Sequence, residues 1–276
     1  MAAEPWDPVE RDRRYASAKR DGLTRLLTEG DSWFDYPPHP NIVDWLEAEG
    51  HWAIKRLEKS GDTVANMASD TNLSVLRSIA RREKPTCILL SGGGNDLFVP
   101  IPESSDLKWI FRLLLDFDST KTAAEHLSPT VWDMKRTEIR LAYVRLIDAL
   151  GSFAPIVIHG YDYLIPSGER AKYDGFRVSG PWILPSMRAH NIVDPSFQRE
   201  ILRVLIDGFN QVLEALERAF PTSVIYVDLR GTLDPNHDWM NEIHPTEQGF
   251  RMVEQKLAAA IRTRLPGVMQ ARAANQ

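Results

Sequence analysis

Short apolar runs alternate with longer amphipathic stretches along the chain. Runs of strand length lie at 22–29, 51–57, 87–90, 155–160 and 223–228. The first of these, 22–29, is only moderately apolar and fits a strand least well. Between the runs, apolar residues recur at helical spacing. This alternation predicts an α/β domain with a mostly parallel sheet.

The starts of four predicted helices carry capping residues. Asn41 precedes an apolar pattern over 41–49, and Thr246 precedes another that contains Phe250, Val253, Leu257 and Ile261. The side chains of such residues accept hydrogen bonds from the first free N–H groups of a helix. Ser128-Pro129 and Asp194-Pro195 add a proline at the first helical position, where its missing N–H costs nothing. A further helix is expected around Leu73, Leu76 and Ile79.

Two segments do not fit the alternation. Residues 161–190 are rich in aromatic residues and proline, too irregular for a simple crossover, and predict a lid or a pocket wall. Residues 98–127 are expected to form a second loop that shapes specificity. No Ser/Gly-rich linker or change of composition divides the chain, so a single domain over 1–276 is expected.

Composition, charge and cysteine count limit the classes of protein to which the chain can belong. The chain has 276 residues, of which 43% are hydrophobic and 26% charged, as in ordinary globular proteins. A net charge of −5 gives no electrostatic reason to expect a nucleic-acid partner. Arg11, Arg13 and Arg14 are interrupted by acids and predict a solvated face. Cys87, the single cysteine, excludes an internal disulfide and is expected to be inert core.

The sequence carries no membrane or export signal. Residues 1–6 lack the basic and apolar regions of a signal peptide, and no apolar stretch approaches the ~20 residues of a membrane span. A cytoplasmic protein is therefore expected. The pattern contains no indication of oligomeric state.

Polar residues follow several of the predicted strands. Ser32, Gly61, Asn95 and His159 each come after one, and His244 follows the last strand after a longer loop. In a parallel sheet the carboxyl ends of the strands meet at one edge, where sites form. A serine needs a base such as histidine to become a nucleophile. An asparagine amide can stabilise the oxyanion that the attack creates.

The ordered set resembles the SGNH hydrolases, also called the GDSL family of esterases and lipases. Gly30-Asp31-Ser32 resembles the first block of that family, with Trp33 in place of the usual Leu-like residue. Gly61 resembles the second block, Gly94-Asn95-Asp96 matches the third, and the run from Trp239 to Pro245 resembles the last. The blocks span most of the chain.

The resemblance implies a three-layer α/β/α, flavodoxin-like fold and ester hydrolysis without a metal or other cofactor. It implies Ser32 as nucleophile and His244 as base, working through an acyl-enzyme. The backbone N–H groups of Ser32 and Gly61 and the side chain of Asn95 would form the oxyanion hole. The substrate would be a small-molecule, lipid or carbohydrate ester.

One position departs from the family pattern. The family usually places Asp three residues before the histidine, and here that residue is Asn241. Asn241 can orient an imidazole but supplies no charge. Three alternatives follow: Asn241 or a backbone carbonyl orients His244, Asp238 acts as a surrogate acid, or the protein is a catalytically impaired carbohydrate- or lipid-binding relative. We favour an active enzyme assisted by Asp238 or Asn241.

Other interpretations explain fewer residues. Trp33 is expected to contact the substrate, and His159 is a further candidate for such a contact. Gly92–Gly94 could hold a phosphate, but the Lys-Ser/Thr of a Walker loop and the dinucleotide fingerprint are missing. A metal site of His237, Asp238 and His244 matches no ligand spacing and leaves Ser32 unexplained.

Overall fold

Five parallel strands form the centre of the computed structural model, which describes residues 7–36, 40–173 and 176–266. Their order is β2-β1-β3-β6-β9. Their bounds are β1 Thr24–Gly30, β2 Trp52–Arg56, β3 Cys87–Ser91, β6 Ile156–His159 and β9 Val224–Val227. In the register of the sheet, Leu26 of β1 lies beside Ile54 of β2 and Cys87 of β3.

Burial explains why these segments are strands. Every residue of β3, β6 and β9 is buried, as expected for a parallel sheet covered on both faces. β1 is the least apolar strand, yet its polar side chains have partners. Thr28 Oγ1 donates to Glu58 Oε2 at 2.6 Å, and Glu29 Oε1 accepts from Gly30 N–H at 3.0 Å. Hydrogen bonding therefore lets a moderately apolar run occupy a central position.

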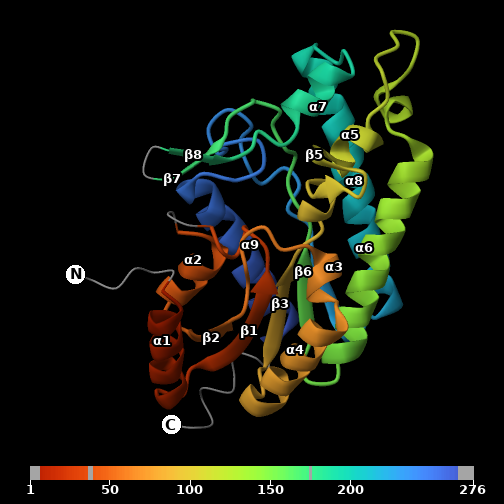
Figure 1. The fold of residues 1–276 in the computed structure, drawn as a ribbon. Coiled ribbons are helices and arrows are strands. Elements are labelled where there is room, and N and C mark those ends of the chain that lie inside the picture. The colour runs from red at the N-terminus through yellow and green to blue at the C-terminus, as the bar shows by residue number, and fades with distance from the viewer. Residues whose placement is uncertain (1–6, 37–39, 174–175, 267–276) are drawn as a thin grey trace.

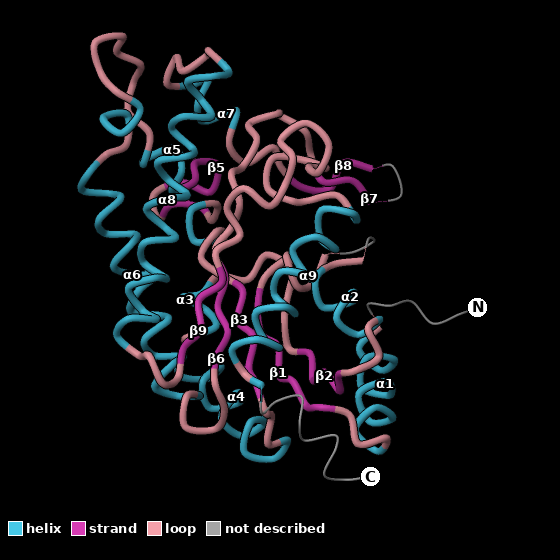
Figure 2. Tube along the Cα trace, turned by 180° about the vertical axis from the view of Figure 1, so that it is seen from behind, coloured by secondary structure: helices cyan, strands magenta, loops and turns pink. Residues whose placement is uncertain are grey.

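Helices cover both faces of the sheet (Figures 1 and 2). α2 (Ile42–Ala48) packs on α9 (Glu247–Arg264) on one face, and α1 (Pro8–Arg20) packs against β2. On the other face, α6 packs against α3, α4 and α8. The bounds of this second group are α3 Val64–Met67, α4 Asp70–Glu83, α6 Pro129–Leu150 and α8 Pro195–Ala219. The predicted three-layer α/β/α fold is confirmed.

The predicted helix starts are the observed ones. Asn41 Oδ1 accepts from the backbone N–H of Val43 at 3.0 Å, and Asp194 Oδ1 accepts from Phe197 N–H at 2.8 Å. Ser128 and Thr246 cap α6 and α9 in the same way. α9 therefore begins three residues after His244, which fixes where that histidine lies.

Two irregular segments rise above the carboxyl ends of the strands (Figure 1). Residues 98–127 contain β4 (Pro100–Ile101), β5 (Ser104–Lys108) and α5 (Trp109–Leu113). Residues 161–190 contain β7 (Ala171–Tyr173), β8 (Phe176–Ser179) and α7 (Leu184–Ala189). Sequence patterns missed these short elements because each contains too few residues to show a period.

The N-terminal arginines correct one expectation. α1 was not predicted, and Arg11 is not part of a solvated face. Its guanidinium forms an ion pair with Asp35 at 2.7 Å, and its side chain is 13% exposed. Arg13 does face solvent, with 77% of its side chain exposed. Arg11 thus fastens α1 to the turn that follows β1.

Other expectations concern the core and the termini. Cys87 is fully buried in β3, and burial raises the pKa of its thiol to about 12, which agrees with an inert core residue. Within the described ranges, no helix combines the length and hydrophobicity needed to cross a bilayer. Residues 1–6, on which the signal-peptide expectation rests, lie outside the described residues.

Candidate active site

Asp31 shapes the turn that presents Ser32 at the end of β1. The Asp31 carboxylate is buried, and its Oδ1 accepts from Trp33 N–H at 3.0 Å and from Ser91 Oγ at 2.9 Å. Its Oδ2 accepts from the hydroxyl of Tyr161. Asp31 N–H in turn donates to the carbonyl of Ser91 at 3.1 Å. Asp31 therefore acts as a structural residue that ties the turn after β1 to the end of β3.

Ser32 and His244 meet at this edge of the sheet, although 212 residues separate them. Ser32 Oγ lies 2.7 Å from His244 Nε2, the distance of a short hydrogen bond. Both side chains are buried. The serine hydroxyl and the imidazole are thus within direct reach for proton transfer.

Asn241 holds the other side of the imidazole. Its Oδ1 lies 3.0 Å from His244 Nδ1 and also accepts from the backbone N–H groups of Ile243 (3.2 Å) and His244 (3.0 Å). Its Nδ2 donates to the hydroxyl of Tyr36 at 3.3 Å. Two backbone donors require the amide oxygen at this place, so the amide orientation is determined. His244 therefore carries its proton on Nδ1 and turns the lone pair of Nε2 toward Ser32.

Burial controls the protonation of His244. The ring centroid of Tyr36 lies 4.2 Å from that of His244, and Trp182 packs edge-on at 5.4 Å. This desolvation lowers the pKa of His244 to about 3. An Asp at position 241 would oppose the shift, but Asn241 is neutral. The imidazole is consequently uncharged at neutral pH.

The Asp238 carboxylate bonds within its own loop. Its Oδ2 accepts from Asp234 N–H at 2.8 Å, within the loop that leads to the site. The contact with His244 Nδ1 is made by Asn241. Of the two residues considered as third member of the site, the geometry therefore favours Asn241.

Asn95 lies at the start of a short 3₁₀ turn after β3. Its Nδ2 donates to the carbonyl of Asp62 at 2.9 Å, which connects the loops after β2 and β3. Asp96 strengthens the connection, since its carboxylate accepts from Val64 N–H at 3.0 Å and Ala65 N–H at 3.3 Å. Burial raises the pKa of Asp96 to about 6 despite these bonds. Only one N–H of the Asn95 amide takes part in the bond to the Asp62 carbonyl.

Gly61 precedes Asp62 in an exposed turn. Its φ is +80°, a left-handed conformation that glycine adopts without strain. Because Asn95 binds the carbonyl of the next residue, the structure brings the Gly61 turn beside Asn95. Gly61 does not line the pocket described next.

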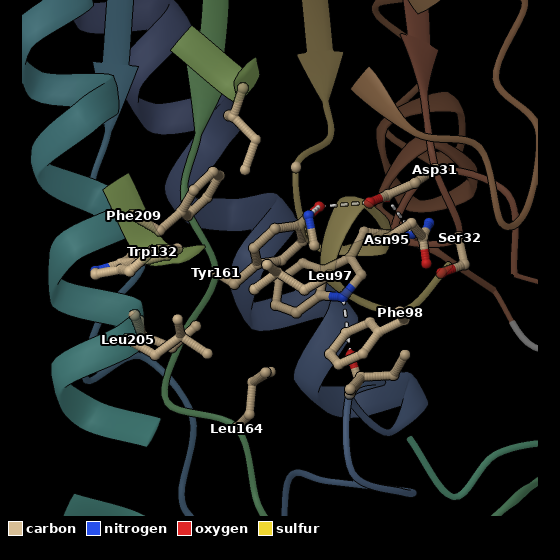
Figure 3. A pocket seen from close by; sticks show the side chains of 16 residues that line it. Asp31, Ser32, Asn95, Leu97, Phe98, Trp132, Tyr161, Leu164, Leu205 and Phe209 are labelled. Carbon is tan, nitrogen blue, oxygen red and sulfur yellow. Dashed lines mark hydrogen bonds between the residues drawn. The ribbon is translucent and has the colours of Figure 1, made fainter. Parts of the chain in front are cut away.

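A pocket, here called the Ser32 pocket, opens beside Ser32 (Figure 3). Ser32 and Asn95 lie at one end, and Trp132, Leu205 and Phe209 lie at the other. Trp33 also lines it, with its indole N–H donating to the Ile243 carbonyl at 2.9 Å. The expected contact of Trp33 with the substrate stays a prediction.

His159 is not part of the Ser32 pocket. Its ring is fully buried, with centroids 6.0 Å from Trp33 and 5.4 Å from Phe34, and its Nδ1 lies 2.8 Å from the Gly160 carbonyl. Burial lowers the pKa of His159. A histidine with these neighbours packs behind the pocket wall, so the structure does not support the expected substrate contact.

Two buried carboxylates near the site, those of Glu242 and Asp162, do not follow from the sequence patterns. Glu242 is fully buried, and its carboxylate accepts from the backbone N–H groups of Gly168, Trp182, Ile183 and Leu184. Asp162 accepts from Tyr163, Gly231, Thr232 and Leu233, at 2.7–2.8 Å. Glu242 fastens the 161–190 segment to the loop of His244. Its one sequence signal is an acid between two site residues, Asn241 and His244.

The metal-site alternative gains no support from the geometry. His237 is 81% exposed and bonds to Asp234, whereas His244 is buried beside Ser32. Across the described part of the chain, no three His, Cys, Asp or Glu side chains are grouped as metal ligands.

Comparisons with known proteins place this arrangement in context. The sequence profile of the GDSL-like lipase/acylhydrolase family matches residues 27–252, which include Ser32 and His244. The fold is similar to that of the lipase Lip_vut3 from a goat rumen metagenome (TM-score 0.53, 15% identity, 86% of this chain and 97% of that one). It is also similar to a lipolytic protein of the G-D-S-L family from Veillonella parvula (TM-score 0.52, 15% identity, 86% and 97%). No curated protein matches the sequence.

Proposed function

Because the chain belongs to the GDSL-like lipase/acylhydrolase family and is an ester hydrolase, we propose that it cleaves carboxylic esters through an acyl-enzyme on Ser32. His244 is the general base. The observation that carries the proposal is the 2.7 Å distance between Ser32 Oγ and His244 Nε2, in a tautomer that leaves Nε2 free to accept.

The reaction follows from the positions of these groups. Ser32 Oγ attacks the ester carbonyl while its proton passes to His244 Nε2. The resulting oxyanion accepts hydrogen bonds from the Ser32 and Gly61 backbone N–H groups and from the free N–H of Asn95 Nδ2. His244 then gives its proton to the leaving alkoxide. A water molecule, deprotonated by His244, attacks the acyl-enzyme, and His244 returns this proton to Ser32 Oγ as the bond to the acyl group breaks and the acid leaves.

Asn241 takes the orienting role that an aspartate has in the related triads. It fixes the tautomer and the ring plane of His244 through the Nδ1–Oδ1 bond. It does not stabilise imidazolium by charge, so the base is weaker than in a triad with a carboxylate. The geometry nevertheless supports turnover, because the Ser32–His244 hydrogen bond is formed.

The first test compares wild type with Ser32→Ala on p-nitrophenyl acetate and p-nitrophenyl octanoate. We expect burst and steady-state release of p-nitrophenol from the wild type and none above background from the variant, whose far-UV circular dichroism should be unchanged. An organophosphonate should label Ser32 irreversibly. Equal rates in the two proteins would remove Ser32 from the mechanism, and an unlabelled, inactive wild type would favour a binding relative of the family.

We infer a small-molecule, lipid or carbohydrate ester as the natural substrate. The cytoplasmic location likewise stays a prediction from the sequence.

A further inference from the structure

The direction in which the Ser32 pocket extends indicates which part of the ester, the acyl chain or the alcohol, enters it. After attack, the oxyanion faces Asn95, and the leaving oxygen must face His244 Nε2 to receive its proton. The pocket is lined by Ser32 and Asn95 but not by His244, and it extends toward α6 and α8 (Figure 3). The group that enters it is therefore the acyl chain, not the alcohol.

The lining selects for an apolar chain. Leu97, Phe98, Ile139, Leu164 and Ile206 form much of the wall. The Tyr161 hydroxyl in the wall is already engaged, since it donates to Asp31 and accepts from Gly94 N–H at 3.3 Å. A charged group at the end of an acyl chain would lose its hydration here without gaining a partner.

The far wall limits the length of the chain. Trp132 of α6 and Leu205 and Phe209 of α8 lie at the end opposite Ser32. Gly93 forms part of the wall with a φ of +112°, and a Cβ there would lie 2.6 Å from the Phe209 ring. The ring of Phe209 therefore lies directly against the backbone of Gly93 and closes the pocket on that side.

The pocket is small. The space open to the centre of a water-sized group is about 40 Å³. This space ends at Trp132, Leu205 and Phe209, so an acyl chain can extend from Ser32 only as far as that wall. We propose that this enzyme is selective for esters of short, uncharged acyl chains and that Leu205, in the far wall, sets the length limit. This inference rests on the proposed function and names the substrate class of the same site.

The experiment measures kcat/KM for p-nitrophenyl acetate, butanoate and octanoate, with p-nitrophenyl hemisuccinate as a charged ester of the same chain length as butanoate. For the wild type we expect butanoate to exceed acetate by about 10-fold, since each buried methylene adds affinity. Octanoate should fall about 10-fold below butanoate because its chain meets the far wall. Hemisuccinate should be slower than butanoate by about 100-fold.

Two variants of Leu205 test the length limit. Leu205→Ala should raise the octanoate-to-butanoate ratio about 10-fold, and Leu205→Trp should reduce butanoate to the rate of acetate or below. Leu202→Ala is the matched control, because Leu202 is an equally buried leucine of α8 that does not line the pocket. It should lower the melting temperature as Leu205→Ala does and leave the chain-length profile unchanged.

The outcomes separate this inference from the function on which it depends. Ser32-dependent hydrolysis with a flat or octanoate-favouring profile, or with hemisuccinate as good as butanoate, would overturn the inference and keep the function. The same shift in Leu202→Ala as in Leu205→Ala would remove Leu205 as the determinant. Absence of Ser32-dependent release from all four esters would overturn both.

Discussion

At the scale of single residues, the chemistry of this site depends on an amide where a carboxylate is usual. Asn241 holds His244 by the same atom pair that an aspartate would use, Oδ1 to Nδ1, but adds no charge. Burial between Tyr36 and Trp182 then acts unopposed on the imidazole and lowers its pKa to about 3. In a triad with aspartate, one carboxylate both orients the imidazole and raises its basicity. Here Asn241 orients the His244 imidazole without raising its basicity.

The pH profile of Asn241→Asp should expose this separation. Wild-type kcat/KM should persist well below pH 6, because His244 stays neutral until the pH approaches about 3. A carboxylate beside Nδ1 favours imidazolium, so the acid limb of the variant should move up by about 2 pH units and the plateau rate should rise about 10-fold. The measurement is kcat/KM from pH 3 to 8.

The control for Asn241→Asp is Asn236→Asp, which adds the same charge at an exposed position of the same loop. Its profile should match the wild type. The melting temperature must be followed at each pH, because the unfolded chain binds a proton on His244 below about pH 6.5 and the folded chain does not until about pH 3. Stability is therefore lost as the pH falls through this window. An acid limb that stays in place in Asn241→Asp would contradict the account.

Asn95 is the second residue whose amide has a proposed role. Asn95→Ala removes the side-chain donor of the proposed oxyanion hole and should lower kcat by about 100-fold or more with little change in KM. Asn66→Ala is the control, since that exposed amide donates at 2.7 Å to the carboxylate of Asp62, the residue whose carbonyl Asn95 binds. If both variants lose activity equally, Asn95 acts by holding the loop and not by meeting the oxyanion.

At the scale of elements, one carboxylate joins the irregular segment to the catalytic loop. The Glu242 carboxylate accepts a hydrogen bond from the backbone N–H of Gly168. It also accepts hydrogen bonds from the N–H groups of Trp182, Ile183 and Leu184, where α7 begins. Trp182 is also the ring that packs edge-on against His244. The position of the imidazole and the position of residues 161–190 are therefore coupled through Glu242 and Trp182.

Glu242→Gln tests this coupling. A glutamine offers one acceptor oxygen in place of two and turns its NH₂ toward backbone donors, so we expect a loss of about 3 kcal/mol in stability. Hydrogen exchange should accelerate in 161–190 more than in β1 or β3, and kcat should fall as Trp182 moves from His244. Glu200→Gln, an exposed position on α8, is the control and should change none of these. Unchanged exchange in 161–190 would show that Glu242 does not fasten the segment.

At the scale of the whole molecule, the sequence predicted the framework and the order of the site blocks but not their surroundings. β3 is a continuous apolar run and α8 repeats apolar residues at helical spacing, so their positions followed from hydrophobicity alone. The partner of His244 did not follow, because Asp238 and Asn241 are close in sequence and only the loop geometry separates them. The role of Glu242 and the exclusion of His159 from the pocket depend on long-range packing that no local pattern encodes.

The same long-range packing predicts how the molecule unfolds. Ser32 follows the first strand and His244 precedes the last described helix, and both are held by one five-stranded sheet. We therefore expect a single cooperative urea transition for the whole chain, with loss of ester hydrolysis, tryptophan fluorescence and far-UV circular dichroism at the same midpoint. Tryptophans report on both regions, because Trp33 and Trp52 lie near the sheet and Trp109 and Trp182 in the irregular segments.

Activity that disappears at lower urea than the circular dichroism, together with an early fluorescence change, would mean that 161–190 opens first, as an independent unit. Two separate transitions in circular dichroism would contradict the single domain expected over 1–276.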